Sequence, residues 1–154
     1  MVIPAATTRD RIVRFDLWAT AAFTIVQVVA AALPDTFAVV SVAVSLALFV
    51  VGSVAFLWGF AHGISRSQYE AVTLGGLFFL GDGAAPADVR RALRVLLAVQ
   101  VVVAVVAASV RPFSELAFGI LVPVLGLGLI TLWAARHGEF AAKEQPAEPG
   151  SPRQ

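Results

Sequence analysis

The sequence predicts an all-α membrane protein, a four-transmembrane-helix bundle made of two helical hairpins. Three observations support it: the composition, four long apolar stretches, and the short breaks after the first and the third of them. Of 154 residues, 59% are hydrophobic and 14% are charged, whereas soluble domains are about half apolar and about a quarter charged. The chain is therefore suited to a solvent that is largely lipid. It has no cysteine, which excludes disulfides and thiolate metal sites.

Each apolar stretch is long enough to cross about 30 Å of hydrocarbon, which needs roughly 17–25 residues in a helix. Breaks at Pro34-Asp35 and at 111–115 are short, so the first two helices form one hairpin and the last two another. We expect residues 1–140 to form the transmembrane domain, and 141–154, rich in Pro, Glu, Gly and Ser, to form a disordered cytoplasmic tail. The expected spans are 15–33, 37–61, 93–110 and 116–134.

The basic residues predict the orientation, because Lys and Arg gather on the cytoplasmic side of membrane proteins. With the N-terminus inside, ten of the eleven Lys and Arg residues are cytoplasmic and only Arg111 is outside. The sequence therefore predicts a multi-pass protein of the cell (inner) membrane with both termini cytoplasmic.

A further apolar segment, 69–80, is too short to span the bilayer. Its neighbours Arg66 and Asp88 both belong inside by the charge distribution. We expect it to form a short amphipathic segment along the cytoplasmic face, with its apolar side chains at the headgroup boundary.

His62 and His137 are the only histidines, and both follow the pattern Leu-Trp-x-x-x-His-Gly at the expected cytoplasmic ends of two helices. Two imidazoles on separate helices of a bundle are able to ligate one haem. The structural interpretation is preferred, because glycine commonly ends a helix and a histidine in the last turn suits the helix dipole. The sequence therefore predicts no resident cofactor and no metal site.

Gln27 and Gln100 are the most polar side chains well inside the spans. They are expected to bridge helices, with the lining of a substrate path as the alternative. Asp16 is expected near the cytoplasmic interface, paired with an arginine. With Asp16 at the interface, no ionisable residue is expected in the middle of a span. This argues against a proton-driven transporter, because such proteins place a carboxylate deep in the membrane. Pro123 lies mid-span and predicts a kink, because proline removes a helix hydrogen bond and frees the carbonyl of Gly119.

Several runs resemble small, uncharacterised four-span membrane proteins of actinobacteria. The resemblance implies the four-span topology over nearly the whole chain and brings no activity with it. The runs are Arg14-Phe15-Asp16-Leu17-Trp18, the Leu-Phe-Phe-Leu-Gly-Asp-Gly loop at 77–83, Arg111-Pro112, and the segments 116–119 and 135–138.

No nucleotide-binding loop, zinc spacing or nucleophile elbow is present, so the sequence predicts no catalytic residue and no enzyme. The expected function is that of a non-enzymatic accessory or scaffolding subunit, which packs in the bilayer against another membrane protein or a second copy of itself. A small oligomeric transporter or channel is the first alternative and a haem-binding membrane protein is the second. The arginine cluster at 90–94 suits anionic lipid headgroups rather than nucleic acid.

Overall fold

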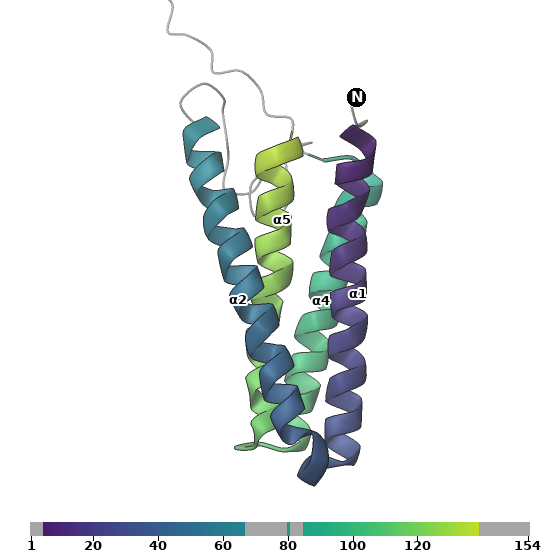
Figure 1. Cartoon of the computed structure of the whole chain (residues 1–154). Helices are drawn as coiled ribbons and strands as arrows, with labels where there is room; N and C mark the ends of the chain where they lie inside the picture. The colour runs from purple at the N-terminus through teal and green to yellow at the C-terminus, as the bar shows by residue number, and fades with distance from the viewer. Residues whose placement is uncertain (1–4, 67–79, 81–84, 139–154) are drawn as a thin grey trace, which may run out of the picture.

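The computed structural model describes residues 5–66, 80 and 85–138 (Figure 1). Within this part of the chain the secondary structure is helical, with no strand. The elements are α1 (Ala5–Ala32), α2 (Pro34–Arg66), α4 (Ala87–Val110), the 3-10 helix η1 (Glu115–Leu121) and α5 (Pro123–His137).

Four helical segments are long and apolar enough to cross a membrane: Arg11–Ala32, Pro34–Ser65, Ala87–Val110 and Glu115–His137. Many of their large apolar side chains are exposed on the outside of the bundle, including Trp18, Val39 and Leu57. The apolar residues therefore occupy the outer surface as well as the core, as expected where lipid is the solvent. The expected apolar stretches lie almost wholly within these segments. At their arginine-bearing ends the helices continue beyond them, so that α1 begins at Ala5 and α4 at Ala87.

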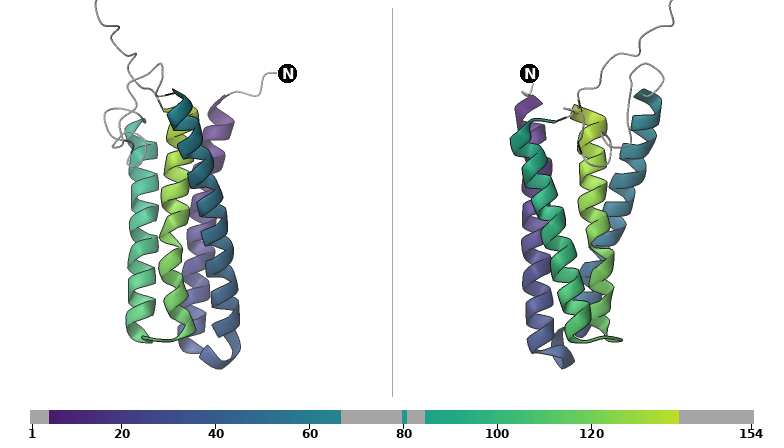
Figure 2. Two further views of the ribbon diagram at one scale, coloured as in Figure 1. Left: turned by 90° about the vertical axis from the view of Figure 1, so that its left-hand side faces the viewer. Right: turned by 180° about the vertical axis from the view of Figure 1, so that it is seen from behind.

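The helices run antiparallel to their sequence neighbours and form one elongated bundle (Figures 1 and 2). The first hairpin turns at Leu33, directly before Pro34 starts α2. The most extensive contact is nevertheless between α2 and α5, which belong to different hairpins, and α1 packs against both α2 and α4. Packing across the hairpins thus holds the two halves of the chain together.

Glycines bring α2 and α5 into backbone contact. A β-carbon at Gly128 would collide with the carbonyl oxygen of Gly52, and one at Gly59 would lie 2.7 Å from the backbone nitrogen of Leu132. Small residues at helix contacts allow such close approach in membrane proteins, where van der Waals packing rather than the hydrophobic effect drives helix association.

The fourth membrane-length segment is not one continuous α-helix with a proline kink. Residues 115–121 form η1, and Pro123 occupies the first turn of α5. The carbonyl of Gly119, expected to be free, accepts a hydrogen bond of 3.0 Å from Val122 N. The tighter 3-10 winding thus supplies a partner for that carbonyl, and proline is well tolerated at a helix start because its missing N–H is not needed there.

The two His-Gly pairs differ from each other. α2 continues through Gly63 to Arg66, so that glycine is inside a helix rather than at its end. α5 does end at His137, but Gly138 has φ −65° and ψ 137°, an extended conformation open to any residue. Glycine was expected to end both helices, but α2 continues past Gly63, and Gly138 follows α5 without the positive φ that would require glycine.

The expected interfacial segment 69–80 lies outside the described residues except for Leu80, which is buried. The tail 141–154 also lies outside them. The turn between α4 and η1 contains Phe113, which is fully exposed and has a positive φ of 62°.

Candidate functional site

A buried polar cluster joins α1, α4 and α5. The amide nitrogen Nε2 of Gln100 donates to Asp16 Oδ1 at 2.9 Å and to Thr20 Oγ1 at 2.7 Å. Its carbonyl oxygen Oε1 accepts from the backbone N–H of Gly126 at 3.2 Å. One side chain on α4 therefore uses both amide protons toward α1 and its oxygen toward α5.

The cluster is sealed. Asp16 and Gln100 are fully buried and Thr20 nearly so. Asp16 Oδ2 is buried as well, and it has no hydrogen-bond partner among the described residues. A buried oxygen without a partner is costly, so the carboxyl is only half satisfied by its surroundings.

The cluster lies at the middle of the bundle rather than at its edge. Gln100 is about 20 Å from the start of α4 and about 15 Å from its end, at 1.5 Å per residue. Because Asp16 is hydrogen-bonded to Gln100, its carboxyl lies at the same depth. Asp16 was expected near the interface with an arginine partner; its hydrogen-bond partner here is an amide in the interior.

The break in the fourth segment lies beside this cluster. Leu125 N–H closes a 3-10 turn onto Val122 O at 2.8 Å, and the next N–H, that of Gly126, points to Gln100. Backbone N–H groups at a helix start lack partners within the helix and are satisfied by side chains or ligands. The first turn of α5 thus presents one backbone donor, the Gly126 N–H, to the polar cluster.

Gln27 forms a separate contact nearer the other end of the bundle. Its Oε1 accepts a hydrogen bond of 3.1 Å from Ser41 Oγ on α2. Its Nε2 is buried against Gly119 and has no partner among the described residues. The two glutamines, expected to have similar roles, are therefore different: Gln100 joins three helices, and Gln27 makes one hydrogen bond.

Polar groups continue along the seam between α1 and α4. Asp16, Thr20, Thr24 and Gln27 follow one another at helical spacing on one face of α1. Two hollows border the seam. One, of about 190 Å³, is lined by Thr24 and Gln27 together with apolar residues of both helices. The other, of about 410 Å³ and nearer the start of α1, is lined by Val13, Arg14, Asp88, Val89 and Ala92.

The structure gives the two histidines different surroundings. His62 is exposed on α2, whereas His137 is partly buried, with its ring centroid 5.5 Å from that of Trp133. Within the described residues there is no group of three or more His, Cys, Asp or Glu side chains that could hold a metal ion.

Sequence reasoning missed Thr20 and the depth of Asp16. The available signal was the spacing of Asp16, Thr20, Thr24 and Gln27, which places four polar side chains on one face of an otherwise apolar helix. Compared with known proteins, the chain matches no family model, no curated protein and no solved structure.

Proposed function

We propose that this is a four-span membrane protein with both ends of the chain on the cytoplasmic side. α1 begins and α5 ends at the same end of the bundle (Figures 1 and 2). The arginines of α1, α4 and α5 lie toward that end of their helices, and Arg111 lies at the other. Because basic residues stay cytoplasmic, this distribution supports the orientation.

We further propose that the protein is a small carrier or channel in which Asp16, Gln100 and Thr20 form the binding site for a proton or a small polar solute. The observation that carries the proposal is the fully buried carboxyl of Asp16 within a membrane-length helix, with one oxygen unpartnered. Ionisable groups at such depth are expensive, and in membrane proteins they mark ion and substrate pathways.

Two other features support it. Carriers commonly bind their substrates near the bilayer midplane at broken helices, whose starting ends direct backbone N–H groups at the substrate. Here α5 starts beside the cluster and follows a 3-10 segment. A cluster closed on all sides also fits a carrier in its occluded state, which opens to one side at a time.

The accessory or scaffolding role is the second candidate. It is favoured by the hydrogen bonding of Gln100, whose amide is fully used in holding α1, α4 and α5 together. In that case the cluster only joins helices, and water never reaches it. The two proposals thus differ in whether the seam between α1 and α4 opens to water.

Orientation is tested with single cysteines, since the chain has none of its own. Asp35→Cys and Ser114→Cys lie at the Arg111 end of the bundle, and Ser65→Cys lies at the opposite end. In intact cells a membrane-impermeant thiol reagent should label the first two and leave Ser65→Cys unlabelled. Labelling of Ser65→Cys from outside would reverse the proposed orientation.

Opening of the seam is tested with Thr20→Cys, which lies in the cluster. A small hydrophilic thiol reagent that reaches both faces of the membrane should label it, because reaction needs water at the thiol. Ile25→Cys is the matched control: it is on the same helix, is 62% exposed and faces outward into the apolar surroundings. If Thr20→Cys reacts no faster than Ile25→Cys, the cluster is permanently dry and the accessory role stands instead.

A further inference from the structure

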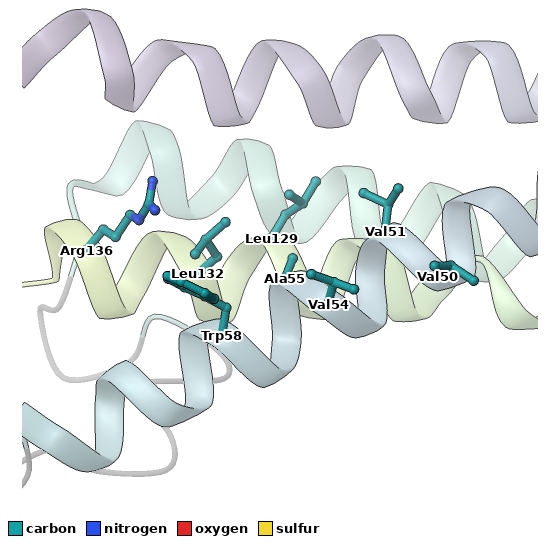
Figure 3. Close-up of a pocket in the computed structure, with 8 residues that line it drawn as sticks. All are labelled: Val50, Val51, Val54, Ala55, Trp58, Leu129, Leu132 and Arg136. Atoms are coloured by element: carbon teal, nitrogen blue, oxygen red, sulfur yellow. The ribbon is translucent and has the colours of Figure 1, made fainter.

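An apolar groove runs along the outside of the contact between α2 and α5 and has a cation at one end. It encloses about 380 Å³. Figure 3 shows Arg136 at one end of the row of lining side chains, Trp58 and Leu132 next to it, and Val50 at the far end. The lining residues are Val50, Val51, Val54, Ala55, Trp58, Leu129, Leu132 and Arg136.

Helical spacing produces this row. On α5, Leu129, Leu132 and Arg136 are three and four residues apart and share one face. On α2, Val50, Val54 and Trp58 follow one another at intervals of four. The groove extends about 12 Å along α2, at 1.5 Å per residue.

The shape of the groove follows from how the two helices meet. Contacts of Gly52 with Gly128 and of Gly59 with Leu132 hold the two backbones together along the groove, and beyond Gly59, toward the end where α1 begins, α2 diverges from α5 (Figures 1 and 2). Arg136, one turn beyond Leu132, thus lies at the end of the groove that is nearest to where the two helices separate.

We infer that this groove binds one phospholipid with an anionic headgroup, its acyl chain along the apolar lining and its phosphate on Arg136. The guanidinium presents paired donors that match phosphate oxygens. Arg136 is exposed and one residue from the end of α5, which is where a headgroup would lie. Trp58, 60% exposed, belongs to the residue type that membrane proteins place at the headgroup level.

The positive charge of Arg136 determines which kind of lipid headgroup the groove prefers. A basic residue between helices at the membrane surface favours anionic lipids. A headgroup with net negative charge should therefore be preferred over a zwitterionic one of the same acyl composition. This inference concerns the outer face of the α2–α5 contact and is independent of the cluster around Asp16.

The test is native mass spectrometry of the full-length protein in neutral detergent, with equal amounts of phosphatidylglycerol and phosphatidylcholine of identical acyl chains. The wild type should retain one phosphatidylglycerol in preference. Arg136→Gln should lower that preference about fivefold, the contribution of one arginine at a membrane surface. Arg111→Gln, at the opposite end of the bundle, should leave it unchanged.

A second pair of variants tests the apolar part. Val54→Phe should fill the groove and reduce retention of both lipids, whereas Val39→Phe, on the same helix and away from the groove, should not. Both positions are more than half exposed, so folding should tolerate the larger side chain. Equal loss of preference in Arg136→Gln and Arg111→Gln would overturn the site. So would a Val54→Phe variant that changes self-association and keeps its lipid, which would assign the groove to a second copy of the chain.

Discussion

Gln100→Leu should be the most destabilising polar-to-apolar change in the bundle. Leucine is similar in size to glutamine, so the main effect is the loss of three hydrogen bonds, to Asp16, Thr20 and the Gly126 N–H. Side-chain hydrogen bonds between membrane helices contribute about 0.6 kcal/mol on average and about 1.7 kcal/mol at most. Three of them give a loss of roughly 2–5 kcal/mol in the free energy of unfolding.

Gln27→Leu is the matched control, a glutamine on an equally buried face with one hydrogen bond, from Ser41. Its expected loss is at most about 1.7 kcal/mol. Because the change also removes a buried donor that lacks a partner, the net effect should be close to zero. Unfolding in mixed micelles with increasing SDS, followed by tryptophan fluorescence, gives both free energies. Equal losses for the two variants, or a larger one for Gln27→Leu, would refute the assignment of Gln100 as the side chain that joins three helices.

Two further predictions concern the glycines and the histidines. Gly128→Ala should destabilise the bundle by about 1–3 kcal/mol, since its β-carbon meets the fixed backbone of Gly52, although alanine is the better helix former. Gly119→Ala should cost less in the same unfolding assay, because its β-carbon meets the movable end of Gln27; the reverse order would contradict the backbone contact. His62→Gln should change stability by no more than about 0.5 kcal/mol, as is usual for an exposed side chain, and His137→Gln by more, through its contact with Trp133. Neither should alter the visible absorption spectrum of the purified protein, and a chromophore lost in either variant would favour haem ligation.

The helical class could be predicted from the sequence because it depends on composition and length alone. Apolar stretches that are long enough to cross the bilayer must form helices, because in hydrocarbon the backbone N–H and C=O groups find hydrogen-bond partners only within the segment itself. The turn at Pro34 could also be predicted, because proline is tolerated at the start of a helix and breaks a helix interior. These features are local, and each follows from a short run of residues.

The helix ends and the broken fourth segment could not be predicted, because tertiary packing decides between alternatives of similar local energy. Gly63 carries the same Trp-x-x-x-His-Gly signal as Gly138, yet α2 continues past it and α5 stops. At Pro123 the sequence allowed either a kinked α-helix or a change of helix type. The structure has the second, in which Val122 N satisfies the Gly119 carbonyl that a kink would have left free.

The depth of Asp16 in the bundle could not be predicted from the sequence, because it depends on which helix packs against α1. In the sequence, Asp16 is only two residues after Arg14. A carboxyl near an arginine at the start of a helix suggests an ion pair at the surface. α1 begins well before the apolar stretch, however, and Asp16 lies on the same face as Thr20, one turn further in. Gln100, midway along α4, meets that face and fixes the carboxyl at its own depth. A proton-driven carrier is disfavoured only where no ionisable group lies in the middle of the bundle. Asp16 is hydrogen-bonded there, so the structure is compatible with a carrier, and whether water reaches Thr20 is the measurement that separates a carrier from a scaffold.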